Sequence, residues 1–289
     1  MKKKAKFDLN KLWTSPSIAL LFCFTIVPLC LLIIFSFMDG NLFAGGEWPG
    51  WTTDNFSKLL HRDTFIKLLI KSLKIGFIVT IACIVIAYPT AWAIAKEVKP
   101  KNRSMLMLMA ILPFFTSQLL LIYAMMNLIQ SGGVLLTFLE LLGIHADSFL
   151  YTTKATVLVL IYEYVPYMIL CLYSSLEGID DNLIHASLSL GAGKAQTFIN
   201  IIFPMTVPGL LSGILLVFVP VCGSFAEAAL VGGASGTMIG SLINSQYQAS
   251  LNMGYGATLS LMLLAILSLI MVIVKWSAAK AQRKIGGEV

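Results

Sequence analysis

Charged residues are scarce in this chain. Asp, Glu, Lys and Arg make up 12% of its 289 residues, whereas soluble domains carry about a quarter. The mean hydropathy is +0.86 and 58% of the residues are hydrophobic, which excludes a soluble globular domain and predicts a polytopic membrane protein. The net charge of +6 does not indicate a nucleic-acid partner, because the basic residues cluster beside hydrophobic stretches, where they set orientation.

Metal-binding and catalytic patterns are also missing. The five cysteines form no CxxC pair, and the three histidines have no HExxH partner. There is no GxSxG motif and no clustered carboxylate pair in the sequence. The stretch GAGK at 191–194 lacks the spacing of a phosphate-binding loop, and Ala195 stands where a hydroxyl would bind Mg²⁺. We therefore expect a non-catalytic chain that itself binds no metal and no cofactor.

Long apolar stretches dominate what is present. A helix needs about 20 mostly apolar residues to cross roughly 30 Å of hydrocarbon. The stretches that reach this length are 16–38, 70–95, 105–129, 154–176, 207–230 and 256–276. They predict an all-α fold with six transmembrane helices in one domain. The remaining parts of the chain are an N-terminal segment (1–15), a polar loop (177–206) and a C-terminal tail (277–289).

Basic residues indicate the orientation of these spans. Six spans place both termini on one side, and most of the 20 Lys and Arg residues lie in the segments on that side. These are Lys2, Lys3, Lys4, Lys6, Lys11, Lys96, Lys99, Lys101, Arg103, Lys194, Lys275, Lys280, Arg283 and Lys284. Lys58, Arg62 and Lys67 lie on the other side, but the total favours cytoplasmic termini.

The polar loop contains the stretch HASLSLGAGKAQTFINIIFP, from His185 to Pro204. Asp180 or Asp181 can cap a helix with apolar positions on one stripe, and Gly191 allows a sharp turn before a second short helix. We also expect Gly193 to loosen the chain after that turn. The positions that define the pattern are His185, Ala186, Ser187, Gly191, Gly193, Ile201, Phe203 and Pro204.

This spacing resembles the EAA motif, E-A-A-x3-G-x9-I-x-L-P, of the permease subunits of bacterial ABC importers. His185 and Ser187 stand where the family usually has Glu and Ala, which puts in doubt any salt bridge that this glutamate makes. The alternative is an ordinary amphipathic cytoplasmic loop that matches the spacing by accident. The resemblance implies that the 177–206 loop couples the permease to an ATPase.

Much of the remaining chain resembles the spermidine/putrescine branch of this family, in the stretches PFFTSQLLLIYA, LYSSLEGID, GAGKAQTFINIIFPMTVPGLLSG and MIGSLINSQY. The resemblance implies a type I importer that works by alternating access. Its expected partners are a second permease, two cytoplasmic ATPase subunits that hold ATP and Mg²⁺, and an external solute-binding protein. The expected cargo is a polyamine, with thiamine-like or other organic ions as alternatives. A secondary transporter is a further alternative, although it usually needs more spans or an inverted repeat.

Intramembrane acids are costly and therefore informative about a pathway. Glu163 lies in the middle of the fourth span, in the sequence YEYVPY, with Tyr164 next to it and Tyr167 one turn away. A carboxylate among aromatic rings can bind an organic ammonium group through charge and cation–π attraction. Alternatively, Glu163 pairs with a basic or hydroxyl group on a neighbouring span and the tyrosines only pack.

The fifth span is interrupted by Pro220 and Gly223, and a break in lipid has to face the interior of the bundle. Ser224 and Phe225 follow the break, where many relatives carry Gly-Glu-Phe. Glu227, one turn further on, is either a pathway acid or a solvated residue at the outer mouth. Gln118 in the third span can line the same pathway or form an interhelical hydrogen bond.

Overall fold

The computed structural model describes residues 9–39, 50–61, 63–143 and 148–286. Within these ranges the regular structure is helical, apart from one isolated β-bridge between Met38 and Trp51. The chain divides into two compact units: unit 1 contains residues 1–62 and 243–265, and unit 2 contains residues 63–242 and 266–289. The predicted all-α class is confirmed.

Several helical segments of the described chain are long and apolar enough to cross a membrane. Five such segments meet both criteria: Asp63–Glu97, Gln118–Leu141, Thr153–Glu177, Lys194–Gly223 and Met253–Ala278. A shorter apolar helix covers Leu20–Ser36, within the first predicted span. Lys2, Lys3, Lys4 and Lys6, on which the predicted orientation partly depends, lie outside the described residues.

Unit 1 is organised around a buried asparagine. Its elements are α1 (Leu9–Ser36), α2 (Asp54–His61), the end of α13 (Ile239–Gln248) and the first part of α14 (Met253–Gly286). The Asn55 side chain donates hydrogen bonds to the backbone oxygens of Ser36 (3.3 Å) and Met38 (2.8 Å). Thr258 on α14 also donates to the Ser36 oxygen, at 3.1 Å. These bonds satisfy the carbonyl group of Ser36, the last residue of α1, which has no partner within that helix, and the carbonyl group of Met38 just beyond it.

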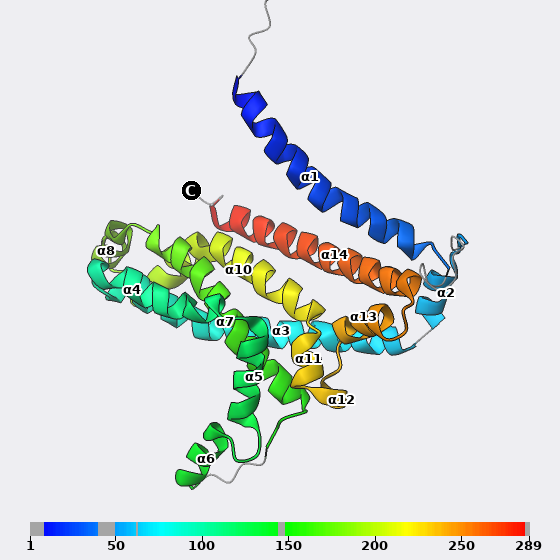
Figure 1. Cartoon of the computed structure of the whole chain (residues 1–289). Coiled ribbons are helices and arrows are strands. Elements are labelled where there is room, and N and C mark those ends of the chain that lie inside the picture. Colours follow the sequence, from blue (N-terminus) through cyan, green and yellow to red (C-terminus); the bar gives the residue numbers. More distant parts are fainter. Residues whose placement is uncertain (1–8, 40–49, 62, 144–147, 287–289) are drawn as a thin grey trace, which may run out of the picture. The chain divides into compact units, whose positions relative to one another are not determined.

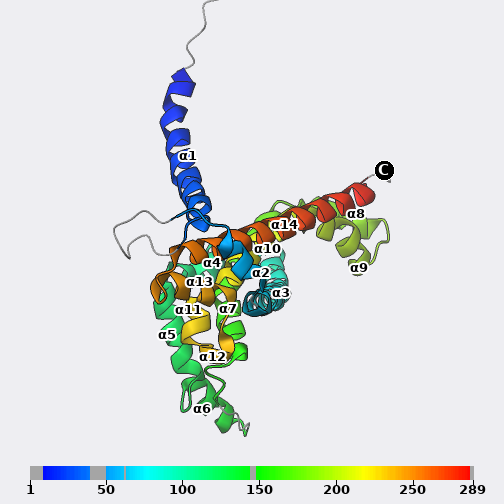
Figure 2. The ribbon, with the colours of Figure 1, turned by 90° about the vertical axis from the view of Figure 1, so that its right-hand side faces the viewer.

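Unit 2 is built on three long helices that run side by side, α3, α7 and α10 (Figures 1 and 2). Its elements up to the polar loop are α3 (Asp63–Trp92), the π-helix η1 (Ala93–Glu97), α4 (Pro100–Ile111), the 3₁₀-helix η2 (Leu112–Phe115), α5 (Gln118–Ile129), α6 (Val134–Leu141) and α7 (Thr153–Glu177). Then come α8 (Asp181–Ser189), α9 (Lys194–Thr197), the π-helix η3 (Phe198–Ile202), α10 (Phe203–Gly223), α11 (Ala226–Leu230), α12 (Gly233–Gly236), the start of α13 and the rest of α14.

A continuous core joins the three long helices. Fully buried side chains include Val79 and Cys83 on α3, Leu172 on α7 and Val217 on α10. The bundle also carries polar links, because Tyr88 on α3 and Thr206 on α10 share a hydrogen bond of 2.8 Å between their hydroxyls. Such interhelical bonds satisfy polar groups that lipid cannot.

Glycines allow α7 and α10 to approach closely. A Cβ atom at Gly209 would lie 2.6 Å from the backbone oxygen of Cys171, and one at Gly213 would lie 2.5 Å from Met168 Sδ. Small residues at a helix interface are the usual means by which membrane helices bring their backbones together. The α7–α10 contact therefore depends on the absence of side chains at these two positions.

The third predicted span, 105–129, is not one helix. Helix α4 ends at Ile111, η2 tightens the chain over the next four residues, and Thr116 is extended with ψ of 143° before α5 begins at Gln118. Pro113 lies at this break, and proline removes a helical N–H donor and clashes with the preceding turn. The 105–129 stretch therefore forms the end of α4, the short 3₁₀-helix η2 and the helix α5.

The break expected in the fifth span occurs after Gly223, where α10 ends, and the chain is extended at Ser224 before α11. Pro220 itself stays inside α10. The predicted interruption is therefore present, and it divides the 207–230 stretch into α10 and the short helix α11.

Candidate functional site

The polar loop forms the helix α8 and a turn that ends it. Asp180 caps α8, because its carboxylate accepts a hydrogen bond of 2.9 Å from the backbone N–H of Asn182. After α8, Gly191 adopts φ of +88°, the left-handed conformation in which glycine is favoured. Gly193, by contrast, has an ordinary φ of −72° and caps α9. We call α8 the coupling helix, after the role that the resemblance to the EAA motif implies for this loop.

A pair of hydroxyl groups ties the coupling helix to α9. Ser187 Oγ lies 2.9 Å from Thr197 Oγ1, and Thr197 is 2% exposed. Thr197 Oγ1 also donates to the backbone oxygen of Gly193, at 3.2 Å. The serine that departs from the EAA pattern thus makes a hydrogen bond that alanine could not make.

We expect Ser187→Ala to loosen the coupling helix. The loss of one partly buried hydrogen bond costs about 1 kcal/mol, which corresponds to about fivefold faster amide hydrogen exchange in α8 and α9. Ser189→Ala is the matched control, because Ser189 is exposed on the same helix. Equal exchange rates in the two variants would contradict a stabilising role for the Ser187 hydroxyl.

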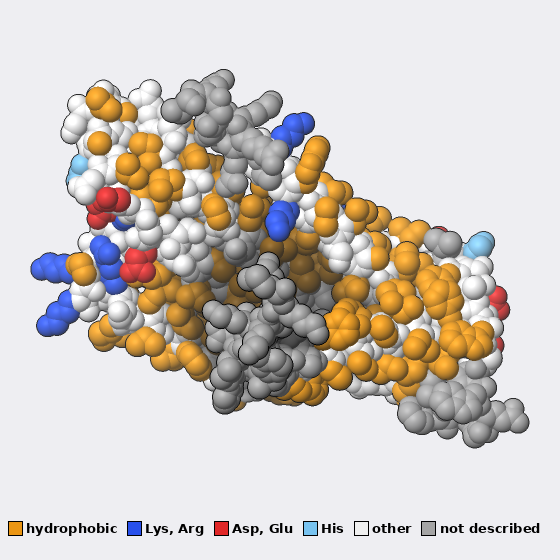
Figure 3. Space-filling model, turned by 90° about the horizontal axis from the view of Figure 1, so that it is seen from above, with side chains coloured by type: hydrophobic (Ala, Val, Ile, Leu, Met, Phe, Trp, Pro, Cys, Tyr) orange, Lys and Arg blue, Asp and Glu red, His pale blue; other side chains and the backbone are white. Residues whose placement is uncertain are grey.

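His185 is exposed on the coupling helix and lines a cavity of about 530 Å³. The cavity lies between η1 and the two short helices of the loop, and its walls include Trp92, Lys96, Lys194 and Phe198. His185 interacts electrostatically with Asp181, one turn earlier on the same helix. Ala186 is exposed. Charged side chains gather at the end of unit 2 that carries α4 and α8 (Figure 3).

The end of the predicted loop is already part of a long helix. α9, η3 and α10 form one helical segment from Lys194 to Gly223, so Ile201 lies in η3, and Phe203 and Pro204 open α10. The wider π turn directly before Pro204 fits the missing N–H of proline, which interrupts the regular ladder. The coupling helix is thus connected to α10 through a continuous helix.

The second group of candidate residues meets inside unit 2. Glu227 on α11 is 1% exposed, accepts a hydrogen bond of 2.6 Å from Gln118 Nε2 and accepts another from Ser224 Oγ. Glu163 on α7 interacts electrostatically with Glu227. Oε2 of Glu163 is buried and has no hydrogen-bond partner in the part of the chain that the structure describes. We call Glu163, Glu227, Gln118 and Ser224 the acidic cluster.

An aromatic row leads to this cluster. The rings of Tyr164 and Tyr167 stack with centroids 5.6 Å apart, and Phe114 lies 4.9 Å from Tyr167. Phe115, 79% exposed, lies 5.8 Å from Phe114. Tyr164 interacts electrostatically with both glutamates. The row therefore extends from an exposed ring on η2 to the acidic cluster.

Five of the six pathway candidates predicted from the sequence lie together, namely Glu163, Tyr164, Tyr167, Ser224 and Glu227. No hydrogen bond or ring contact within the described residues joins Phe225, which is 47% exposed, to this group. Phe114 and Phe115 were missed by the sequence reasoning. The available signal was Pro113 in front of them, which marks a break within an apolar stretch.

A comparison with protein families decides what kind of molecule this is. Residues 76–286 match the family of binding-protein-dependent transport system inner membrane components. The chain belongs to this family. The importer-permease identity predicted from the EAA-like spacing is thereby confirmed, and the chain is an inner-membrane transport component rather than an enzyme.

Relatives of this inner membrane component carry more specific names. It is 39% identical over 199 residues to the spermidine/putrescine transport system permease protein PotB of Escherichia coli (strain K12). The matched residues cover 68% of this chain and 72% of that protein. Its identity to PotB of Salmonella typhimurium (strain LT2) is 36% over 249 residues, or 86% of this chain and 85% of that protein.

A solved structure supports the fold of this inner membrane component. The bacterial alginate ABC transporter in complex with an alginate pentasaccharide-bound periplasmic protein contains a chain that matches with a TM-score of 0.74 at 17% identity. The match covers 96% of this chain and 94% of that chain. At this identity the likeness establishes the ABC importer permease fold and nothing about cargo.

Proposed function

We propose that this chain is a permease subunit of an ATP-driven, solute-binding-protein-dependent importer for polyamines such as spermidine and putrescine. The names of its PotB relatives support this cargo. The structural observation that carries the proposal is the buried, unpartnered Oε2 of Glu163 beside Glu227. A bare carboxylate oxygen next to a second acid is an unsatisfied site that a cation would satisfy.

The electrostatics of the acidic cluster favour a cation over an anion or a neutral solute. Two acids held close together in a poorly hydrated interior repel each other, and each is costly to bury. Both oxygens of Glu227 already accept hydrogen bonds from Gln118 and Ser224, whereas Glu163 has acceptor capacity to spare. An ammonium group between the glutamates would relieve the repulsion and donate to the free oxygen.

The aromatic row suits the rest of a polyamine. Spermidine and putrescine carry ammonium groups separated by methylene chains, and aromatic faces attract ammonium groups while packing against methylenes. Phe114, Tyr167 and Tyr164 provide such faces in succession. We propose that cargo passes along this row to Glu163 and Glu227.

The proposed transport cycle is alternating access driven from the cytoplasm. The chain is part of an ABC importer complex, and the proposed partners are a second permease, two ATPase subunits and an external solute-binding protein. ATP and Mg²⁺ would bind the ATPase subunits, and both termini of this chain would be cytoplasmic. Closure of the ATPases would move the coupling helix and, through α9 and η3, the long helix α10.

The test is uptake by the reconstituted complex with radiolabelled spermidine and putrescine, comparing wild type with Glu163→Gln. We expect the substitution to lower uptake about thirtyfold, because loss of one partner of a desolvated charge contact costs roughly 2 kcal/mol or more. Assembly and basal ATPase activity are expected to persist, since glutamine has nearly the same shape as glutamate.

Glu140→Gln is the matched control, because Glu140 is exposed on α6. It should transport at the wild-type rate. Uptake of a different organic cation with no response to polyamines would overturn the cargo and leave the cationic site standing. Unchanged polyamine uptake in Glu163→Gln would overturn the role of the acidic cluster, and a wild-type chain that recruits no ATPase would overturn the importer mechanism.

A further inference from the structure

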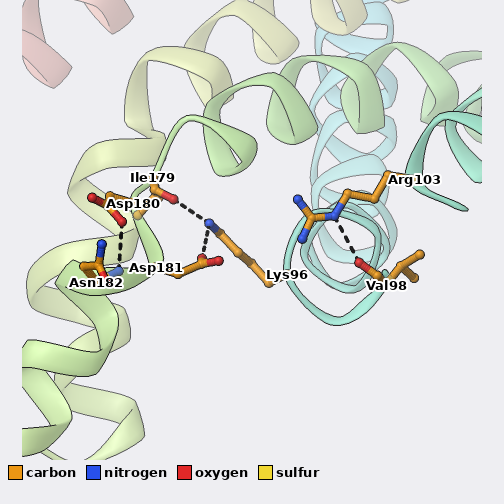
Figure 4. A network of polar contacts seen from close by, with 7 residues as sticks. All are labelled: Lys96, Val98, Arg103, Ile179, Asp180, Asp181 and Asn182. Carbon is orange, nitrogen blue, oxygen red and sulfur yellow. Dashed lines mark hydrogen bonds and ion pairs between the residues drawn. The ribbon is translucent and has the colours of Figure 1, made fainter. Parts of the chain in front are cut away.

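A single lysine bridges the joint between α7 and the coupling helix. Lys96 lies in η1, at the end of α3, and its Nζ donates to the backbone oxygen of Ile179 at 2.5 Å and to Asp181 Oδ1 at 2.6 Å (Figure 4). Ile179 belongs to the turn between the two helices, and Asp181 is the first residue of α8. One ammonium group therefore holds both sides of the joint.

The base of this lysine is fixed to the transmembrane core. Ile94 and Ala95, just before Lys96, are buried in the same hydrophobic cluster as Leu176 and Ile179. The lysine side chain is only 8% exposed, whereas that of Asp181 is 59% exposed, so water competes less for the bond to Ile179 than for the bond to Asp181. Its ammonium group is thus held in place with respect to both α3 and the end of α7.

Besides the lysine bonds, the packing of Ile179 into the hydrophobic cluster restrains the joint. Gly178 contributes no side chain, and Asp180 is engaged in capping the N–H of Asn182. Beyond the joint, the 530 Å³ cavity separates η1 from α8 and α9. Packed side chains therefore do not fill the space beside the lysine, toward α8 and α9.

The partner of Lys96 remains ionised under working conditions. The hydrogen bond from Lys96 lowers the pKa of Asp181 from its usual value. Burial opposes this as the second-largest effect, and the charges of Lys96, Arg103 and His185 lower the pKa further. A carboxylate whose pKa is depressed keeps its charge at neutral pH. Asp181 therefore carries the negative charge that the ion pair with Lys96 requires at neutral pH.

We propose that Lys96 is a positioning residue that clamps the α7–α8 joint, so that displacement of the coupling helix turns α3 and α7 as one body. This inference rests on the proposed function, in which an ATPase moves the coupling helix. Without the clamp, part of each stroke would be absorbed by bending at Gly178 to Asp180. Hydrolysis would then continue while less cargo crossed the membrane.

The experiment measures spermidine uptake and ATP hydrolysis on the same reconstituted complexes, and compares the ratio of cargo to ATP. Lys96→Met keeps the length of the side chain and removes its charge and its donors. We expect the ratio to fall about tenfold, as the coupling between two sites weakens. Hydrolysis should change by less than about twofold, because in the proposed function the ATPase subunits bind ATP and this chain does not. Lys96→Arg, which retains a charged donor, should restore most of the ratio.

Lys101→Met is the matched control, since Lys101 is exposed on α4 in the same region and should leave the ratio unchanged. A role limited to stability would reduce the amount of complex but leave the ratio per assembled complex intact, and that result would overturn the proposal. If Lys96→Met fails to assemble, Asp181→Asn tests the same clamp from the other side, and a wild-type ratio there would also overturn it. Failure of the proposed function is distinct, because the wild-type complex would then show no polyamine-stimulated hydrolysis.

Discussion

Replacing Gly209 with valine is expected to abolish the folded permease or lower its stability by about 3 kcal/mol. A Cβ atom at this position would lie 2.6 Å from the backbone oxygen of Cys171 and 2.8 Å from Ser175 Cβ, and would also overlap Ser175 Oγ. The serine hydroxyl can rotate away, but the carbonyl oxygen belongs to α7 and cannot. The two helices would have to separate, and the core between them would open.

The measurement is the yield of monodisperse protein in detergent together with its thermal unfolding midpoint. Gly223→Val is the matched control, because Gly223 ends the same helix and has open space around its Cβ position. Valine there should leave yield and midpoint close to wild type. A Gly209→Val protein that behaves like this control would mean that α7 and α10 do not approach as closely as the structure indicates.

The second large effect concerns Glu227. We expect Glu227→Gln to lower polyamine uptake about thirtyfold, as for Glu163→Gln. Each substitution removes one of the two carboxylates that we propose bind the same cation. The double variant should be little worse than either single variant, since groups that act as a unit have strongly non-additive effects. In the variant, Gln118 can still donate to the amide oxygen and the Ser224 hydroxyl can accept from the amide NH₂, so folding should survive.

A double-mutant cycle of these four proteins distinguishes one cation site shared by both glutamates from two independent sites. Initial uptake rates are measured for wild type, both single variants and the double variant, normalised to assembled complex. Independent roles would multiply the two losses to about a thousandfold. Such a product, or a Glu227→Gln variant with wild-type uptake, would contradict the joint binding of a cation by α7 and α11.

The coupling helix and the turn after it were largely predictable from the sequence, because the signals that form them are local. A cap at Asp180, a helix with an apolar stripe and a glycine that permits a left-handed turn each act within a few residues. The structure has these features at Asp180 and Gly191. The clamp at Lys96 was not predictable in the same way, because the lysine and its partners Ile179 and Asp181 are far apart in the sequence and meet only in the fold.

The third span shows where composition misleads. The 105–129 stretch is apolar enough for one crossing helix, but Pro113 and the extended Thr116 divide it. Hydropathy averages over a window and does not register the loss of a single backbone donor. Phe114 and Phe115 belong to this break, so their place at the entrance of the aromatic row was hidden by treating the stretch as continuous.

The sequence by itself determined the membrane class, the helical fold and the importer family, because hydropathy, charge placement and the loop spacing are properties of order along the chain. It also indicated Glu163 and Glu227 as costly intramembrane acids, each considered separately. Only the tertiary structure brought them together, with Gln118 donating to Glu227 and with Glu163 Oε2 left without a partner among the described residues. The physical reason is that the energy of a buried charge depends on which groups surround it, and those groups come from α5, α7 and α11, which only the packing of the helices places side by side.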